Sequence, residues 1–351
     1  MKTSALLTGF LASQALAHPG MGRVMAEIKA RDDFNLEGRS TDLIGDLKNG
    51  TSTSVGNTIK SILQGASAIS TGGSYTAPGP LGSDACSKDP LCLWSYVVKD
   101  LSSAFVDANG CTDAARGAIR LGFHDAATWD KDSTYGGADG SIVLSDELSR
   151  RENRGLAAIG AQTKGWYDKY HPYGAGMADI IQTSAIVATV SCPAGPRIKA
   201  YVGRKDNPTA GPTGKLPSPF QDAQSLIDLF AAKTFSASDL VALVGAHSSS
   251  KQFFVDPARA GAPQDSTPGT WDTKFYGETL KGDNKTILIF PSDKNLATYS
   301  ATKAQWNVFA GAAGPATWGP AYASAYFRMS MLGLDNINNL TEISRLIPQP
   351  R

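Results

Sequence analysis

Apolar residues recur at helical spacing along most of the chain from residue 86 onward, and this pattern limits the fold more than any other feature. One such stripe consists of Trp94, Val97, Val98, Leu101 and Phe105. We predict further helices over 113–126, around 177–188, around 226–230, from 239 to about 246 and over 322–332. The segment Ser236-Ala237-Ser238-Asp239 is typical of a capping box opening the helix from 239. Only Ile287–Phe290 is predicted as a strand, so the expected fold class is mainly α.

The first 17 residues have the pattern of a secretory signal. Met1-Lys2 supplies a positive charge, Ala5–Ala12 is a short apolar run, and Ala15-Leu16-Ala17 is a small-x-small cleavage site. We expect removal after Ala17 and a secreted, extracellular protein. A buried N-terminal helix is the alternative.

The charge balance excludes several classes of partner. Lys and Arg total 33 against 32 Asp and Glu, which leaves a net charge of +1. This balance gives no electrostatic basis for binding nucleic acid or an anionic membrane surface. No later segment has the roughly 18 uninterrupted apolar residues of a membrane span.

Residues 18–85 differ from the rest of the chain. Two short amphipathic stretches, 41–47 and 55–63, precede a run rich in Ser, Thr, Gly and Pro over 65–83. We predict a loosely structured N-terminal extension and linker, with 86–351 as the main domain. A propeptide or a partner-binding arm is the functional alternative.

Four cysteines in an oxidising compartment predict two disulfides, and three pairings are open. Cys86–Cys92 with Cys111–Cys192 is favoured, because the first bond closes a local loop and the second a long one, where loop-closure entropy is larger. Glycosylation is expected at one or more of three sequons, which begin at Asn49, Asn284 and Asn339.

Arg120 and His124 lie one helical turn apart in the segment AIRLGFHDA and therefore share a helix face. Two polar side chains on one helix face are expected to line a cleft, because a guanidinium needs hydrogen-bond partners or water. The positive charge disfavours protonation of the imidazole. His124 could therefore act as a general base while Arg120 stabilises negative charge. A surface arginine beside a hydrogen-bonded histidine is the alternative.

His247 ends the apolar segment DLVALVGA and could either cap that helix or ligate a metal or haem. The chain has only four histidines, so few are available for a zinc site that requires several histidine ligands. Each histidine is followed by a set of hard oxygen ligands suited to Ca²⁺, although such clusters are also typical of turns. The first set is Asp125, Gly137 (by its carbonyl), Asp139 and Ser141, and the second is Ser248, Asp265, Thr267, Thr270 (by its carbonyl) and Asp272.

Residues from about Cys86 to Leu346 resemble the secreted class II, or fungal, branch of the plant, fungal and bacterial haem peroxidase superfamily. ARGAIRLGFHDA matches the distal-helix signature at every fixed position, and DLVALVGAHSS matches the proximal signature except at Ser249. GGADGSI and DSTPGTWDTKFYGETL resemble the two calcium segments, and residues 203–220 resemble the central loop. The resemblance implies a two-lobed helical fold with haem b between the lobes and two bound Ca²⁺.

The resemblance also implies roles for the site residues. His247 would be the proximal iron ligand, and Asp293 would accept its ring N–H. His124 would take a proton from H2O2 and deliver it to the leaving oxygen, while Arg120 would stabilise the departing charge. Phe123 would pack over the haem face, Asn153 would hold the other ring nitrogen of His124, and the two oxygen sets would bind distal and proximal calcium. Cys111 and Cys192 match a family disulfide.

Departures from the family pattern concern the reducing substrate. Relatives that oxidise Mn²⁺ use three acidic residues where this chain has Asp113, Gly117 and Phe253, so specific manganese oxidation is not expected. Relatives that oxidise bulky aromatics use a surface tryptophan at the position of Ala242. Half of the usual cysteines are missing, all on the proximal and C-terminal side.

We therefore predict a secreted haem peroxidase that reduces H2O2 and oxidises small phenolic donors by one-electron steps. The expected partners are H2O2 and small aromatic reductants, with no nucleic acid, no membrane and a monomeric state. A manganese- or lignin-oxidising peroxidase is one alternative. A haem-binding secreted protein without turnover is another, but it would not need Arg120, His124 and Asp293 together.

Overall fold

The computed structural model describes residues 38–282 and 285–351, which belong to one compact unit. The signal predicted over 1–17, residues 18–37 and the sequon residue Asn284 lie outside the described residues.

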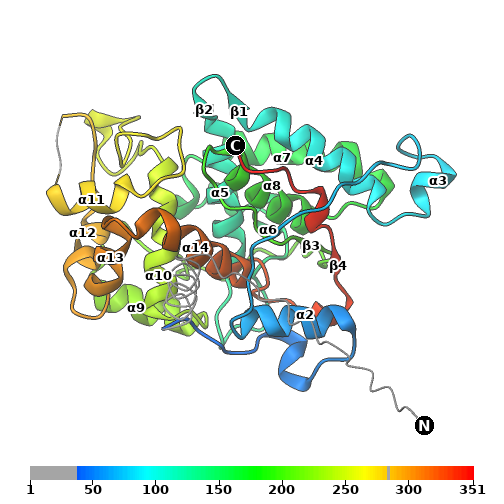
Figure 1. Ribbon diagram of the computed structural model, residues 1–351, viewed down its shortest axis with the longest axis horizontal. Coiled ribbons are helices and arrows are strands. Elements are labelled where there is room, and N and C mark those ends of the chain that lie inside the picture. Colours follow the sequence, from blue (N-terminus) through cyan, green and yellow to red (C-terminus); the bar gives the residue numbers. More distant parts are fainter. Residues whose placement is uncertain (1–37, 283–284) are drawn as a thin grey trace, which may run out of the picture. The chain divides into compact units, whose positions relative to one another are not determined.

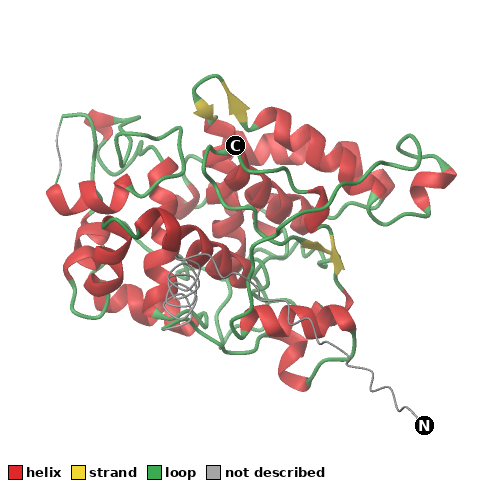
Figure 2. Cartoon of the chain, viewed as in Figure 1, coloured by secondary structure: helices red, strands yellow, loops and turns green. Residues whose placement is uncertain are grey.

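Helices dominate the described chain, which confirms the prediction of a mainly α fold (Figures 1 and 2). The α-helices are α2 (Ser54–Leu63), α3 (Asp84–Ser87), α4 (Cys92–Ala104), α5 (Asp113–Ala126), α6 (Ser141–Leu144), α7 (Ala157–Tyr170), α8 (Met177–Ser191), α9 (Ala223–Ala232), α10 (Ala237–Val244), α11 (Lys274–Lys281), α12 (Pro291–Thr298), α13 (Lys303–Ala310) and α14 (Gly314–Met329).

Local sequence signals explain where several helices begin. Helix α5 has the predicted bounds. Helix α10 opens with the expected capping box, in which the Ser236 and Asp239 side chains each accept a backbone N–H of the other residue. Helix α14 starts earlier than the stretch predicted over 322–332. Pro315 lies in its first turn and Pro320 inside it, and prolines obscure a helical pattern in sequence.

Helix α8 is buried along its whole length and packs against α4, α5 and α7. The approach of α5 is close, because a β-carbon added at Gly122 would lie 2.7 Å from the Ala185 side chain. The Gln182 amide also donates to the carbonyl of Gly122 (3.0 Å). Glycine is therefore required at this crossing, which fixes the helix that carries Arg120 and His124.

Helices α10 to α14 form a second group (Figure 1). Buried aromatic side chains lie within this group. The Tyr276 hydroxyl donates to the carbonyl of Val241 (2.7 Å), and the Trp318 indole donates to that of Ala242 (2.9 Å). Trp306 in turn donates to the carbonyl of Tyr276 (3.0 Å). These bonds tie helix α10 to its neighbours and satisfy the polar edges of buried aromatic rings.

Residues 38–70, here called the N-terminal arm, pack into the core and differ from the loose structure predicted over 18–85. Ile44 and Ile59 are fully buried, and helix α2 contacts the 3-10 helix Ile337–Asn339. The apolar residues of the two amphipathic stretches are thus core residues, which need a tertiary partner that sequence patterns do not reveal. Residues 71–83, which make up most of the Ser/Thr/Gly/Pro run, contain no helix or strand.

A buried arginine of helix α14 anchors the N-terminal arm. The Arg328 guanidinium donates to the main-chain carbonyls of Ser40 (2.8 Å), Asp42 (2.8 Å) and Leu63 (3.2 Å), and to the hydroxyl of Thr234 (3.2 Å). Arg328 is 3% exposed. A guanidinium this deeply buried must be hydrogen-bonded, and three of its four partners belong to the arm.

The strand predicted over Ile287–Phe290 is wrong. Leu288 donates its N–H to the carbonyl of Pro263 (2.9 Å), but no ladder forms, and the apolar run is extended and largely buried instead. An apolar run can be buried without a neighbouring strand. The strands among the described residues form two short antiparallel pairs, β1 (Val106–Asp107) with β2 (Gly110–Cys111), and β3 (Tyr201–Val202) with β4 (Thr341–Glu342).

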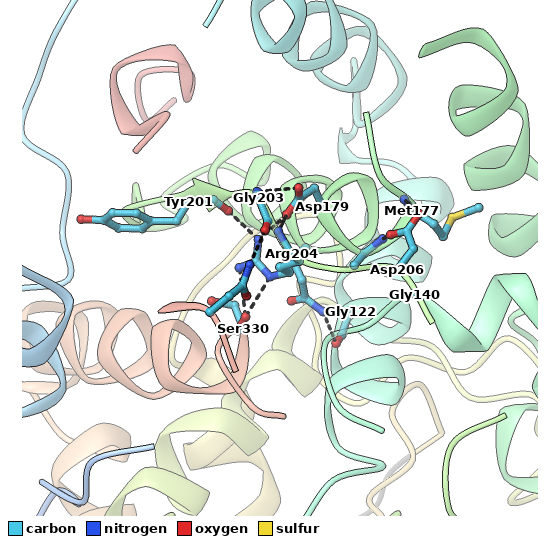
Figure 3. Close-up of polar contacts among 12 residues, drawn as sticks. Gly122, Gly140, Met177, Asp179, Tyr201, Gly203, Arg204, Asp206 and Ser330 are labelled. Carbon is cyan, nitrogen blue, oxygen red and sulfur yellow. Dashed lines mark hydrogen bonds and ion pairs between the residues drawn. The ribbon is translucent and has the colours of Figure 1, made fainter. Parts of the chain in front are cut away.

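The central loop after β3 is held to the start of α8 by buried polar contacts (Figure 3). Arg204 pairs with Asp179 (Nη1 to Oδ1, 2.8 Å) and donates to the carbonyl of Ser330 (Nη2, 2.9 Å). Asp206 accepts the backbone N–H of Met177 (2.8 Å) and so caps α8 from outside the helix. The loop is therefore positioned against α8 by charge-assisted hydrogen bonds.

Both favoured disulfides are present, Cys86–Cys92 and Cys111–Cys192, and there is no free cysteine. The second joins β2 to the end of α8. In the described part of the chain, no single helix is long and apolar enough to cross a membrane. The bent pair Ala223–Ala232 and Ala237–Ser249 reaches that length and composition only when taken together.

Candidate functional site

His124 on helix α5 is held by hydrogen bonds at both ring nitrogens. Its Nδ1 lies 2.7 Å from Asn153 Oδ1, and its Nε2 accepts from Arg120 Nε (3.2 Å). The Asn153 amide group donates to the carbonyl of Glu147 (2.8 Å), which leaves its oxygen to face the histidine. Nδ1 must therefore carry the ring proton, and the electron pair of Nε2, which here accepts from Arg120, is the one that can take a second proton.

The surroundings of His124 keep its ring neutral. The side chain is 8% exposed, and burial together with the positive charge of Arg120 lowers its pKa to about 3. The hydrogen bond to Asn153 acts in the opposite direction but is the smaller effect. A neutral imidazole beside a fixed positive charge is the state that a general base needs.

Arg120 is oriented by the main-chain carbonyls of the two residues that flank Asn153. Nη1 donates to the carbonyl of Arg154 (2.7 Å) and Nη2 to that of Glu152 (3.3 Å). Burial lowers its pKa to about 10, so the guanidinium remains charged at neutral pH. The ring of Phe123 stands edge-on to His124, with centroids 5.5 Å apart. The four predicted distal residues thus lie together on α5 and the adjacent loop.

His247 lies in the 3-10 helix η5 (Gly245–Ser249), directly after α10. Its Nδ1 is 3.0 Å from Oδ2 of Asp293, which is buried in the first turn of α12. Gln264 donates to the same carboxylate oxygen (3.1 Å), and the ring of Phe275 meets the imidazole edge-on. Each of these contacts fixes the plane of the imidazole.

The residues around His247 fit an axial ligand of haem. Its side chain is 31% exposed although Asp293 is 1% exposed, so the ring reaches outward from a buried anchor. Because Nδ1 is hydrogen-bonded to a carboxylate, Nε2 is the ring nitrogen that can ligate a metal ion. A neutral histidine whose other nitrogen donates to a carboxylate is typical of metal-ligating histidines.

The first set of oxygen ligands lies together beside His124. Burial and the negative charges of Asp139 and Glu147 raise the pKa of Asp125 well above its usual range. The hydroxyl of Ser141 is buried without a hydrogen-bond partner. The carbonyl of Gly137 accepts the nearby N–H of Asp139 (2.8 Å). Close buried carboxylates beside an unpaired hydroxyl fit a hard divalent cation.

The second set lies beside His247. The Ser248 hydroxyl donates to the carbonyl of Thr270 (3.2 Å), and the Thr267 hydroxyl to Asp272 (2.8 Å). Asp265 is fully buried, and its Oδ2 has no hydrogen-bond partner. Burial, aided by the negative charge of Asp272, raises the pKa of Asp265 to about 7. An unpaired buried carboxylate oxygen again fits a bound cation.

Neither set is a cluster of acids or histidines. Over 38–282 and 285–351, no group of three or more His, Cys, Asp or Glu side chains is arranged to hold a metal ion. Each set instead mixes carboxylate, hydroxyl and main-chain oxygens. This mixture matches the preference of Ca²⁺ rather than that of Zn²⁺.

The positions at which manganese-oxidising relatives have acids do not form an acidic site. Asp113 accepts from Nε (3.0 Å) and Nη2 (2.7 Å) of Arg116 and from Lys251 Nζ (3.3 Å). A β-carbon at Gly117 would lie 3.0 Å from a neighbouring side chain. Phe253 at the third position is 49% exposed and apolar. Ala242, which replaces the surface tryptophan, is itself buried.

Sequence reasoning missed three residues that support the site: Glu147, Asn207 and Gln264. Asn207 donates to Asp139 (3.2 Å), and Glu147 accepts the N–H of Gly211 (2.7 Å), so the central loop holds the distal oxygen set. Gln264 shares Asp293 with His247. Asn207 and Gln264 lie in loops, and Glu147 opens the three-residue 3-10 helix Glu147–Ser149, so no spacing signal could have identified them.

A histidine hydrogen-bonded to an arginine on one helix, and a second histidine oriented by a buried carboxylate, suit proton transfer beside a haem iron. The family model described as Peroxidase matches residues 97–312. A Peroxidase of Arthromyces ramosus is 31% identical over 308 residues, which cover 79% of this chain and 80% of that protein. Manganese peroxidase 3 of Phlebia radiata is 30% identical over 74% of this chain and 77% of its own length. Ligninase C of Trametes versicolor is 29% identical over 82% of each chain.

The chain belongs to the peroxidase family. It is therefore an H2O2-dependent oxidoreductase, and the family implies haem as its cofactor. The prediction of a haem peroxidase is confirmed at this level.

Proposed function

We propose that this protein is an extracellular haem b peroxidase that oxidises small phenolic donors, with His124 as its general base. The observation that carries the proposal is the hydrogen-bond chain from Glu147 through Asn153 to His124. This chain puts the ring proton on Nδ1 and leaves Nε2 basic in a site where the ring stays neutral.

Haem b, held by His247, would supply the iron at which H2O2 is reduced and which would later regain single electrons from the donor. The Nε2 atom of His124 would exchange its hydrogen bond from Arg120 for one from peroxide and take the peroxide proton. The Arg120 guanidinium would stabilise the negative charge on the leaving oxygen, and His124 would then return the proton to that oxygen. Phe123 would pack over the haem face.

On the other side, Asp293 would hold the Nδ1 proton of His247 and increase the electron density of its ring. Gln264 keeps the carboxylate in place by donating to the same oxygen atom as the histidine. The pair would thus set how readily the bound haem loses electrons.

Two Ca²⁺ ions would complete the fold around the site. Asp125, Gly137, Asp139 and Ser141 would bind the distal ion, and Ser248, Asp265, Thr267, Thr270 and Asp272 the proximal one. The unpaired oxygens of Ser141 and Asp265 support this assignment. Treatment with a calcium chelator should lower the Tm of the holoprotein, and added Ca²⁺ should restore it. An unchanged Tm, with no calcium found by elemental analysis of the untreated protein, would contradict the assignment.

The three positions at which manganese-oxidising relatives have acidic residues support a phenolic donor over Mn²⁺. Asp113 is engaged by two cations, and Gly117 and Phe253 offer no oxygen ligand. The names of two relatives, a manganese peroxidase and a ligninase, keep the other donor classes as alternatives. Turnover of Mn²⁺ or of a non-phenolic aromatic would favour them.

We further propose a secretory signal over 1–17, a main domain over 86–351 completed by the N-terminal arm, and a monomeric extracellular protein. Asn49 and Asn339 are exposed, as glycan attachment requires. Size-exclusion chromatography of the secreted protein, with mass spectrometry of its N-terminus and glycans, would test each point.

Stopped-flow absorption of the holoprotein mixed with H2O2 tests the central proposal. Rapid loss of Soret intensity, reversed by a phenol, is expected. His124→Ala should keep haem bound but lose this reaction. A wild-type haem spectrum that ignores peroxide would favour a haem-binding protein without turnover, and an unchanged rate in His124→Ala would remove His124 as the base.

A further inference from the structure

Two side chains share one oxygen atom of Asp293. His247 Nδ1 lies 3.0 Å from Oδ2, and the Gln264 amide nitrogen donates to the same atom (3.1 Å). The other oxygen, Oδ1, accepts a longer hydrogen bond from the hydroxyl of Ser292 (3.4 Å). Asp293 and Gln264 are each 1% exposed, so their hydrogen bonds are shielded from bulk water. The oxygen that faces the imidazole therefore has a second, buried donor.

The orientation of the Gln264 amide follows from its two neighbours. An ionised carboxylate only accepts hydrogen bonds, so the NH2 group must face Asp293 and the amide oxygen must face away from it. That oxygen accepts the hydroxyl of Ser250. The amide is therefore fixed at both ends, which keeps its donor aimed at Oδ2 of Asp293.

These contacts form a closed ring that returns to His247. The Ser250 hydroxyl also contacts the main-chain carbonyl of His247 (3.1 Å). The ring thus runs from the imidazole to Asp293, Gln264 and Ser250, and back to the main chain of the histidine. Backbone bonds reinforce it, because Ser250 N donates to the His247 carbonyl (3.1 Å) and Gln264 N to the Ser250 carbonyl (3.4 Å). The fold therefore fixes the position of Gln264 relative to the imidazole.

Apolar rings lie against the imidazole within this arrangement. Phe275 and Phe290 each meet it edge-on, with ring centroids 5.7 Å and 5.4 Å away. In apolar surroundings the effective dielectric constant is low, so one hydrogen bond to the carboxylate has a larger electrostatic effect than it would have in water. The amide of Gln264 brings partial positive charge to Asp293 without adding a net charge.

A second donor on an oxygen atom weakens the bond that the first donor makes there. The Gln264 N–H group stabilises negative charge on Oδ2 and so lowers the attraction of that oxygen for the Nδ1 proton of His247. The proton then stays closer to the imidazole, which has less imidazolate character and donates less electron density through Nε2. A metal ion held by a weaker electron donor is easier to reduce.

We propose that Gln264 raises the reduction potential of the bound haem by drawing part of the charge of Asp293 away from His247. The inference rests on the proposed function, because it requires His247 as the ligand of the haem iron. Gln264 is a positioning residue, since it acts through Asp293 and takes no part in proton transfer from peroxide. A higher potential extends oxidation to phenols that give up an electron less readily, so Gln264 would widen the range of donors.

The test measures two properties of the haem-loaded protein that do not depend on turnover. Spectroelectrochemical titration gives the reduction potential, and resonance Raman spectroscopy of the reduced protein gives the frequency of the iron–histidine stretch. Gln264→Met keeps the length of the side chain but removes the donor, so it should lower the potential and raise the stretching frequency. Loss of packing alone would weaken the iron–histidine bond and lower that frequency, so the sign of the shift separates the two explanations.

Two further variants test the route through Asp293. Ser250→Ala removes the hydroxyl that holds the Gln264 amide, so it should shift both readouts in the same directions as Gln264→Met and to a smaller extent. When Asp293→Asn is already present, Gln264→Met should shift the potential far less than it does in the wild type, because the shared carboxylate is gone. With H2O2 present, the ratio of the rates with para-cyanophenol and para-methoxyphenol should fall in Gln264→Met.

Gln224 provides a matched control. Its amide nitrogen donates to the carboxylate of Asp228 (2.8 Å) on the exposed surface of helix α9, outside the ring of contacts around His247. Gln224→Met therefore breaks the same kind of hydrogen bond and should shift neither readout. Equal effects of Gln224→Met and Gln264→Met would overturn the inference.

The outcomes separate this inference from the proposed function. If His247→Ala binds haem with an unchanged iron–histidine stretch, His247 is not the ligand and the proposed function fails on that side. If His247→Ala loses the stretch but Gln264→Met leaves the potential unchanged or raises it, only the role of Gln264 is refuted. Should Gln264→Met not retain haem, Ser250→Ala decides the question by the same signs.

Discussion

Asn153 offers the most direct test of how the chain makes His124 basic. Replacing Asn153 with Ala removes the acceptor that lies 2.7 Å from Nδ1 while leaving His124 and Arg120 in place. As His124 takes a proton, its Nδ1–H bond becomes charge-assisted, and such bonds contribute about 1.5–3 kcal/mol. The alanine variant lacks this stabilisation of protonated His124, so its reaction barrier is higher by the same amount. The reaction with H2O2 should therefore be roughly 10- to 150-fold slower.

The assay is stopped-flow absorption of holoprotein variants over a range of H2O2 concentrations. Asn153→Asp is the matched variant, because it keeps an acceptor oxygen and adds a negative charge that should raise the pKa of His124. The aspartate variant should therefore retain far more activity than the alanine variant at neutral pH. If Asn153→Ala slows the reaction less than about threefold with an unchanged Soret spectrum and Tm, the hydrogen bond does not support catalysis and the reasoning fails.

Further predictions concern the proximal pair and two buried cations. Asp293→Asn should raise the reduction potential of bound haem, because a neutral amide leaves the imidazole of His247 less electron-rich; an unchanged potential in spectroelectrochemical titration would exclude this role. Arg328→Met should lower the free energy of unfolding by about 2–3 kcal/mol, since it removes the donor to the carbonyls of Ser40, Asp42 and Leu63, of which that of Leu63 is buried. Urea titration checks this, and a loss below about 1 kcal/mol contradicts it. Burial lowers the pKa of Lys233 from 10.5 to about 8. Between these two pH values Lys233 is protonated in the unfolded state but not in the folded state. The free energy of unfolding should therefore increase by about 3 kcal/mol as the pH rises from the lower value to the higher one. Lys233→Met should lack that gain, and a pH dependence identical to the wild type would refute it.

The sequence predicted those parts of the fold whose signals are local. Helix α5 and the capping box of α10 depend on periodicity and on side chains within one turn, and both were located correctly. The strand at Ile287–Phe290 was predicted wrongly, because an apolar run indicates burial without indicating a partner strand. The N-terminal arm was misjudged for the related reason that its short amphipathic stretches depend on distant partners for stability.

In the candidate site, too, local sequence signals predicted some residues and not others. Arg120 and His124 could be paired from spacing alone, since four residues make one helical turn. The pairing of His247 with Asp293, 46 residues apart, came only from family resemblance. Glu147, Asn207 and Gln264 act through side-chain contacts with residues distant in the sequence, and nothing in their local sequence distinguishes them from ordinary polar residues.

The N-terminal arm also has a consequence for how the chain reaches its folded state. Its contacts with Arg328 and Asn338 join residues separated by up to 292 positions. Contacts of such high sequence separation form late and slow folding, since the loop that joins them must close first. During synthesis, the arm emerges first but finds its partners only when nearly the whole chain is available. Until then, Ile44, Ile59 and the part of α14 that packs against α2 remain exposed, which makes the incomplete chain prone to aggregation.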